Sequence, residues 1–177
     1  MRITSCLIFV VAVSILFSGC INTGMEVGQK VPDFFFYDLN GKKVRIYDHL
    51  NHKKILLLHF WGAACCFTYS AQTIKAVSSI YQFDEFDDVE VISVNLDYPS
   101  PKVKKITDEL QIKHLMLTDR DSLYYLKEPE LKFFFPLALI LAVDEKGIIR
   151  GKLKGPQMIA SIEEVLLSAR NWQENSK

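Results

Sequence analysis

The fold of this chain is decided by residues 56–70, which read Leu-Leu-Leu-His-Phe-Trp-Gly-Ala-Ala-Cys-Cys-Phe-Thr-Tyr-Ser. The stretch begins as a continuous apolar run, which is typical of a strand buried on both faces. Small residues follow at 62–64 and favour a tight turn from that strand into a helix. The sequence therefore predicts Cys65 at the start of a helix. The unpaired N–H groups and the dipole of a helix start favour a thiolate, which lowers the pKa of the thiol.

The composition fits one ordinary globular domain with short additions. The chain has 177 residues, of which 49% are hydrophobic, so it can bury a sizeable core. Its formal net charge is zero, which gives no indication of a nucleic-acid partner. The short cluster of Lys102, Lys104 and Lys105 is interpreted as the solvated face of a helix.

The first residues have the pattern of an export signal. Arg2 is followed by an apolar run at 7–17, which is too short to span a membrane, and then by Ser18-Gly19-Cys20. Small residues before a cysteine resemble a bacterial lipobox, which implies cleavage before Cys20 and a lipid on its thiol. An ordinary secretory signal with an incidental Cys20 is the alternative. We therefore expect an extracytoplasmic protein held on a bacterial membrane by a lipid anchor.

These features divide the chain into a signal peptide at 1–19, a tether at 20–30, a domain at 31–171 and a tail at 172–177. The division also accounts for the cysteines. Of the four, Cys6 would be removed with the signal and Cys20 would carry the lipid. Cys65 and Cys66 remain, and adjacent cysteines cannot cross-link distant parts of a fold, so a disulfide framework is excluded. Thiols kept only at this position indicate chemistry.

The order of predicted elements indicates an α/β domain with a central sheet covered on both faces. The dipeptide Asn40-Gly41 favours a type I′ hairpin turn between the first two strands. The predicted strands are 34–39, 42–46, 54–60, 89–96, 115–117, 137–143 and 148–153. The predicted helices are 68–83, 101–112, a small one at 121–126, and 157–171.

Several stretches together resemble one known family over Val27–Ala169. They are Val31-Pro32-Asp33-Phe34, the hairpin at 38–42, the strand at 56–61, the strand at 91–97, and Val143-Asp144 with Gly147. In this order and spacing they are similar to the TlpA/ResA type of membrane-tethered thiol–disulfide oxidoreductases. The resemblance implies a thioredoxin-like three-layer sandwich, with a central mixed sheet, an N-terminal β-hairpin and helices on both faces. It also implies partner proteins with thiols or disulfides, and no cofactor.

The resemblance is incomplete at the chemical site. Aligning on Phe60-Trp61 places Cys65 on the attacking cysteine of the family, and Cys66 and Phe67 between it and the resolving position. Thr68 stands at that resolving position, and a hydroxyl cannot resolve a mixed disulfide, although it could donate a hydrogen bond to a Cys65 thiolate. Cys66 is the alternative resolver, but a bond between adjacent cysteines is strained and easily reduced.

Other residues near the motif also depart from the family or complete it. Ala64 replaces a tryptophan, Ala71 stands where an acidic residue assists proton transfer, and Thr73 replaces a proline. Pro136 is matched to the cis-proline that faces the attacking cysteine, with a trans proline at the start of a strand as the alternative.

Three aromatic residues complete the predicted site. Trp61, Phe67 and Phe135 are the predicted substrate-binding residues beside Cys65. Trp61 is most simply a large residue that flanks the site, and core packing is the plainer interpretation of Phe135.

Two classes of function follow. The first is a thiol–disulfide oxidoreductase that acts through Cys65 and mixed disulfides. The second is a redox-inactive binding module that keeps only the scaffold. A thiol peroxidase is less favoured, because 62–64 lack the proline and threonine expected before a peroxidatic cysteine. No metal is predicted, since His49, His52 and His114 have no partners at metal-ligand spacing, and His59 is interpreted as a hydrogen-bonded strand residue.

Overall fold

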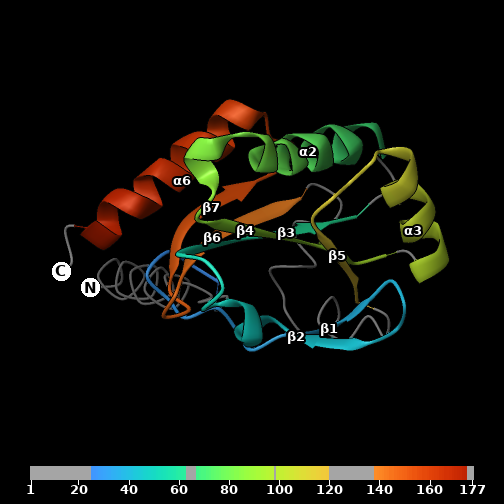
Figure 1. Ribbon diagram of the computed structural model, residues 1–177, viewed down its shortest axis with the longest axis horizontal. Helices are drawn as coiled ribbons and strands as arrows, with labels where there is room; N and C mark the ends of the chain where they lie inside the picture. The colour runs from blue at the N-terminus through green and yellow to red at the C-terminus, as the bar shows by residue number, and fades with distance from the viewer. Residues whose placement is uncertain (1–24, 63–66, 98, 120–137, 175–177) are drawn as a thin grey trace, which may run out of the picture.

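The computed structural model describes residues 25–62, 67–97, 99–119 and 138–174, and it contains one seven-stranded sheet with the strand order β2-β1-β5-β4-β3-β6-β7 (Figure 1). The strands are β1 (Phe35–Asp38), β2 (Lys43–Arg45), β3 (Ile55–Trp61), β4 (Val89–Asn95), β5 (Leu115–Thr118), β6 (Leu139–Asp144) and β7 (Ile149–Lys154). The α-helices are α2 (Phe67–Ser79), α3 (Ser100–Glu109) and α6 (Ile159–Glu174), and the 3-10 helices are η1 (Ile46–His49), η2 (Ile80–Gln82) and η3 (Asp84–Phe86).

The apolar run predicted as a buried strand is β3, and all seven of its residues are buried. It lies between β4, which runs parallel to it, and β6, which runs antiparallel. A strand pairs with it on each edge, and other elements pack on both faces of the sheet here. Its sequence therefore shows no alternation between apolar and polar residues. The sheet is therefore mixed, and its central strand leads directly to the segment that carries Cys65.

The predicted hairpin joins β1 and β2 in antiparallel register. Oδ1 of Asp38 accepts hydrogen bonds from the backbone N–H groups of Asn40 (2.9 Å) and Lys42 (2.8 Å), which closes the turn. Gly41 has a φ of +85°, a left-handed conformation that glycine adopts without steric cost. The hairpin is therefore where Asn40-Gly41 predicts it, but the turn type is corrected: a type I′ turn needs a positive φ at both residues, and Asn40 does not have one.

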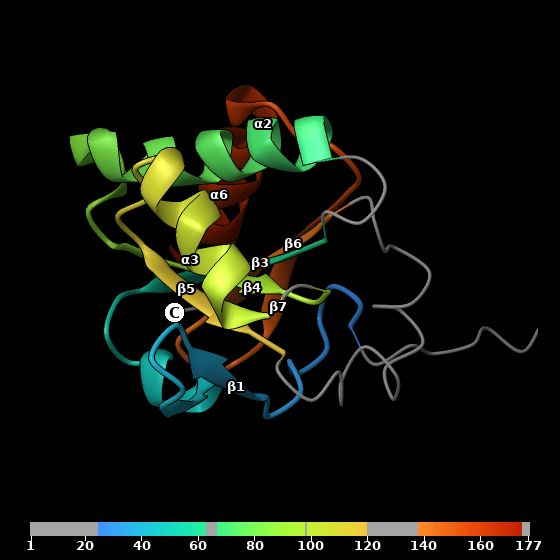
Figure 2. The same ribbon diagram turned by 90° about the vertical axis from the view of Figure 1, so that its right-hand side faces the viewer.

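One face of the sheet is covered by α2, α3 and α6 (Figure 2). Ile55 and Leu57 of β3 pack there in one cluster with apolar residues of α2 and α6, including Val77 and Leu166. A second cluster joins the end of β3 to α3 and β5. Positions 55, 57, 59 and 61 share this face because side chains of a strand alternate.

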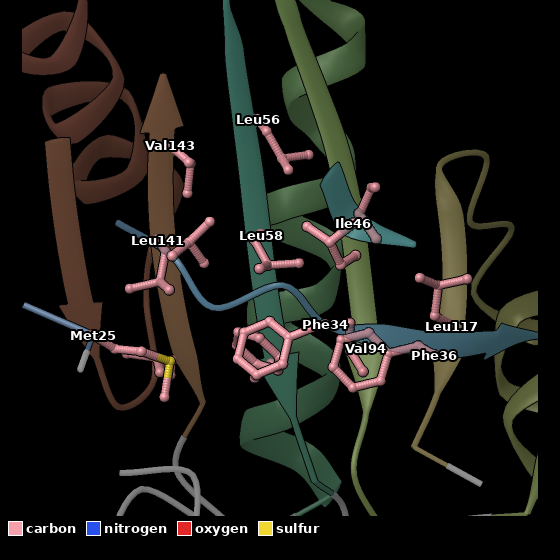
Figure 3. Packing of buried hydrophobic residues seen from close by; sticks show 14 of the residues in the cluster. Met25, Phe34, Phe36, Ile46, Leu56, Leu58, Val94, Leu117, Leu141 and Val143 are labelled. Atoms are coloured by element: carbon pink, nitrogen blue, oxygen red, sulfur yellow. The ribbon is translucent and has the colours of Figure 1, made fainter. Parts of the chain in front are cut away.

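The opposite face is covered by η1 and by the chain leading into β1. The aromatic rings of Phe34, Phe36 and Phe60 meet there, with centroids 5.4 to 6.0 Å apart, and Figure 3 shows Phe34 near Leu58 and Phe36 near Val94. Met25 is fully buried in the same cluster, although the sequence places it in the tether. Gly28 N–H also donates to the Ile149 carbonyl at 2.8 Å, so part of that stretch packs on the domain.

Two predicted helices are shorter in the structure. The first ends as an α-helix at Ser79, whose hydroxyl donates to the Ala76 carbonyl at 2.7 Å, and continues as η2. The second ends at Glu109, because Gln111 adopts a left-handed conformation with φ of +54°. Sequence periodicity does not show where such an end occurs.

The predicted α/β fold with a central mixed sheet and an N-terminal hairpin is confirmed. Among the described residues, the three α-helices cover one face of the sheet and the 3-10 helix η1 lies on the other. The small helix predicted at 121–126 and the first residues of the strand predicted at 137–143 lie outside the described residues. Within the described part of the chain, we find no helix with the length and apolar character needed to cross a membrane.

Candidate functional site

The site predicted from sequence lies between β3 and α2. β3 ends at Trp61 and α2 begins at Phe67, so Cys65 and Cys66 fall within a short link between a strand end and a helix start. The link at 63–66 is outside the described residues, as are Cys20, Phe135 and Pro136. The structure describes the end of β3 before the link and the start of α2 after it.

Both ends of the link are fastened to the domain. The Ser70 hydroxyl, in the first turn of α2, donates to the carbonyl oxygen of Gly62 and so joins the helix to the end of the strand. On the other side, the Leu96 N–H donates to the Trp61 carbonyl at 3.0 Å. These bonds hold the two ends of the link in one place relative to the sheet.

The structure makes Trp61 a core residue. Its side chain is 1% exposed and packs with Ile74 of α2, Val103 and Ile106 of α3, and Met116 of β5. Burial leaves it no surface for a substrate, because its position in β3 directs it to the helix-covered face. The expectation that Trp61 binds substrate is therefore corrected to a packing role beside the link.

Thr68 is exposed in the first turn of α2, which leaves its side chain accessible at the helix start where the sequence places it. Thr73, which replaces a proline of the family pattern, is fully buried. Its hydroxyl oxygen accepts a hydrogen bond from the Gln157 N–H at 3.1 Å and so ties α2 to the segment before α6. Phe67 begins α2.

Polar residues gather at the carboxyl ends of β4 and β5, beside the end of β3. Asn95 is fully buried and its register partners are Trp61 and Thr118. Its side-chain N–H donates to Asp97 at 3.0 Å, and its backbone carbonyl accepts from the Asp119 N–H at 2.9 Å. Sequence reasoning missed this group, but polar residues ending two neighbouring parallel strands were the available signal.

A buried chain of polar side chains lies on the helix-covered face of the sheet. Nδ1 of His59 is 3.1 Å from the Ser93 hydroxyl, which is 2.8 Å from Nε2 of His114. Tyr81 stacks on His114 with ring centroids 6.3 Å apart. The prediction that His59 is a hydrogen-bonded strand residue is confirmed. We call His59, Ser93 and His114 the buried histidine chain.

Both histidines of this chain stay neutral at physiological pH. Burial lowers the pKa of His59 to about 3, and the nearby His114 adds to the effect. Burial alone lowers the pKa of His114 to about 4. Nε2 of His59 and Nδ1 of His114 have no hydrogen-bond partner among the described residues, so protonation would place an uncompensated charge in the core.

Ala138 is strained where the described chain resumes before β6. Its φ is +71°, in a region that residues with a Cβ seldom adopt, and its carbonyl accepts from the Gly155 N–H at 2.9 Å. Such strain persists only where surrounding structure enforces it, and it is concentrated at functional sites. Ala138 lies two residues after Pro136 in the sequence, and Pro136 is the residue matched to the family's cis-proline.

A mixed sheet in which a strand–link–helix unit presents cysteines defines a thioredoxin-fold protein. The solved structures agree with this class. The chain is similar to a thiol:disulfide interchange protein from Bacteroides sp., with a TM-score of 0.62, 21% identity, and coverage of 80% of this chain and 90% of that one. It is also similar to peroxidoxin BcpB from Mycobacterium tuberculosis, with a TM-score of 0.68, 16% identity, and coverage of 83% and 97%.

Sequence comparison identifies the family. Residues 27–151 match the model of the AhpC/TSA family, and the chain belongs to that family. Among curated proteins it is 26% identical over 144 residues to thiol-disulfide oxidoreductase ResA from Bacillus thuringiensis subsp. konkukian, covering 80% of this chain and 78% of that protein. The ResA-like resemblance seen in the motifs is thus confirmed.

Proposed function

We propose that the protein is an extracytoplasmic thiol–disulfide oxidoreductase that uses Cys65 as its single nucleophile. The observation that carries the proposal is the family match, which runs through the link between β3 and α2 and so includes both cysteines. The name of the curated relative, a thiol-disulfide oxidoreductase, supports the same chemistry. Lack of a cysteine at position 68 supports a mechanism with one attacking thiol.

The proposed exchange has two balanced steps. The Cys65 thiolate attacks a partner disulfide, forming a mixed disulfide and releasing one partner thiolate. A thiolate from the same or a second partner then attacks the partner sulfur of the mixed disulfide. This forms a new partner disulfide and regenerates the Cys65 thiolate, so no electrons are gained or lost overall.

The residues next to Cys65 would adjust its reactivity. The exposed Thr68 lies in the first turn of α2, where its hydroxyl would donate a hydrogen bond to the thiolate. The free N–H groups of the helix start would favour the same charge. Cys66 would be the internal alternative to an external thiol, at the cost of a strained ring between neighbours. Pro136 and Phe135 are proposed to contact the partner.

The proposed location follows from the N-terminal pattern. A cleaved signal at 1–19 and a lipid on Cys20 would hold the domain on the outer side of a bacterial membrane. Thiol–disulfide exchange suits such a compartment, because disulfides form and persist there. Mass spectrometry of the membrane fraction from a bacterial host would find Cys20 at the N-terminus with a diacylglyceryl mass. A free N-terminus at another residue would contradict the anchor.

The decisive experiment measures the iodoacetamide alkylation rate against pH, residue by residue, by mass spectrometry. We expect Cys65 to titrate with a pKa below the ordinary thiol value of about 8.5. Cys66→Ser is the matched control and should retain this titration, whereas Cys65→Ser should abolish both the fast alkylation and the trapping of mixed disulfides. An ordinary pKa with slow alkylation would favour the binding module.

A thiol peroxidase is the second candidate, and the fold similarity to peroxidoxin BcpB is the observation that favours it. In that reaction the Cys65 thiolate would attack a peroxide oxygen, forming a sulfenic acid and releasing water or an alcohol. Peroxide consumption with a thiol reductant separates the two functions. Fast consumption that depends on Cys65 would replace the exchange mechanism, while rates near those of a free thiol would exclude peroxidase activity.

A further inference from the structure

A mixed cluster of metal-ligating side chains lies at the other end of the sheet, where β3 and β4 begin. Nδ1 of His49, in η1, is 2.6 Å from Oε1 of Glu90, and Nδ1 of His52 is 3.1 Å from Oε2 of the same carboxylate. The ligand atoms of the three residues all lie within 4.8 Å of one another. The sequence did not reveal this group, because Glu90 is far from both histidines along the chain.

The carboxylate of this cluster is held in place but incompletely bonded. The side chain of Glu90 is 15% exposed and that of His49 is 16% exposed, while His52 is 57% exposed. Although Nδ1 of His52 is near Oε2, the contact lacks hydrogen-bond geometry, and this buried oxygen has no hydrogen-bond partner among the described residues. Beyond the 3.1 Å contact with His52, a bound cation would compensate this buried oxygen directly.

The cluster is also open to solvent on one side. Glu90 and His52 line a groove of about 500 Å³, which gives an ion and a further ligand access to the site.

We propose that His49, His52 and Glu90 form a binding site for a divalent transition-metal ion of the Zn²⁺ class. Two imidazoles and one carboxylate are a recurrent zinc ligand set, and they leave a fourth position open. Ligand atoms of a tetrahedral zinc ion are about 3.3 Å apart. Nδ1 of His52 is already near that spacing from Glu90, whereas His49 and Glu90, 2.6 Å apart, would separate slightly and exchange their hydrogen bond for bonds to the ion. The open fourth position would face the groove.

The site is independent of the thiol chemistry. β3 begins beside this cluster and ends at the link that carries Cys65, and its residues 55–61 span about 20 Å. A metal bound at the cluster cannot reach the thiol, so loss of either function would leave the other measurable. The plainer alternative is that His49 and Glu90 only fasten η1 to β4.

The test is calorimetric titration of the full chain with Zn²⁺ after its cysteines have been alkylated, so that thiols do not compete. We expect one ion per chain, and His52→Asn or Glu90→Gln should weaken binding at least about tenfold. Asp87→Asn is the matched control, because this exposed carboxylate lines the same groove outside the cluster. It should bind Zn²⁺ as the unchanged protein does.

Imidazole ¹⁵N NMR provides a second readout on the same samples. Zn²⁺ should shift the ring nitrogens of His49 and His52 and leave those of His59 and His114 unchanged. Absence of saturable binding, equal weakening by Asp87→Asn, or binding that survives both His52→Asn and Glu90→Gln would overturn the proposal. Circular dichroism would show that each variant is folded, and the exposure of His52 makes its replacement structurally mild.

Discussion

Acid should weaken this fold through the buried histidine chain. In the folded protein His59 and His114 have pKa values of about 3 and about 4, whereas in the unfolded chain both return to about 6.5. The unfolded state therefore binds protons that the folded state excludes once the pH falls below about 6.5. The stabilisation is complete above that pH and is lost progressively as the pH falls toward the folded-state values.

The size of the effect follows from proton linkage. Between pH 8 and pH 5 each histidine should lower the free energy of unfolding by about 2 kcal/mol, or roughly 4 kcal/mol for both. Domains of this size are stable by about 5–15 kcal/mol in total, so the loss is a large fraction. Carboxylates with ordinary pKa values contribute little above pH 5, which makes this window specific for histidine.

Urea unfolding followed by circular dichroism at several pH values measures this dependence. The variant His59→Leu removes one of the two groups and leaves Ser93 bonded to His114. It should therefore lose only about 2 kcal/mol between pH 8 and pH 5, half the loss of the unchanged protein. His52→Asn is the control, because that histidine is mostly exposed and its removal should preserve the full loss.

Two results would refute this reasoning. One is a free energy of unfolding that stays constant from pH 8 to pH 5. The other is a pH dependence that His59→Leu leaves unchanged while His52→Asn reduces it. Either result would mean that the buried histidines are protonated in the fold, or that exposed groups govern its acid sensitivity.

Three substitutions test the packing of the domain by urea unfolding. Gly151→Ala should destabilise by about 1–3 kcal/mol, because the added Cβ would lie 2.4 Å from Cγ1 of Val165 in α6. Asp144→Ala should cost about 3–5 kcal/mol, because it leaves the buried Arg150 guanidinium without the carboxylate now 2.7 Å away. Thr73→Val should cost about 1–2 kcal/mol, because the Gln157 N–H loses its acceptor while the shape of the side chain is kept.

Matched changes at exposed positions provide the controls. In Gly41→Ala the added Cβ would have no atom within 4 Å, so this variant tests only the left-handed backbone. We expect it to lower the free energy of unfolding by about 1–2 kcal/mol without a packing clash. Asp48→Ala removes an exposed carboxylate 3.8 Å from Arg45 and should cost less than about 1 kcal/mol. If Asp144→Ala lowered the free energy of unfolding no more than Asp48→Ala does, burial would not determine the strength of these ion pairs.

The sequence by itself determined the order of the elements and the position of the thiols between β3 and α2. Local physics accounts for this success. The apolar run at 56–61 is typical of a strand buried on both faces, and Gly41 supplies the left-handed residue of the hairpin turn. The alternation of strands and helices also predicted a central sheet, whereas the order of the strands within that sheet came from the structure. The positions of Cys65, Cys66 and Thr68 in the motif came instead from the resemblance to the TlpA/ResA family, aligned on Phe60-Trp61.

Only the tertiary structure decided which side chains meet. Glu90 joins His49 and His52, and Ser93 joins His59 to His114, because neighbouring strands bring residues of distant sequence into register. Trp61 shows the same limit, since its place beside the motif suggested a contact surface and its direction from β3 buried it. A sequence specifies what each segment prefers locally. Contacts between segments depend on register and on the face of the sheet, and these are fixed only when the whole domain packs.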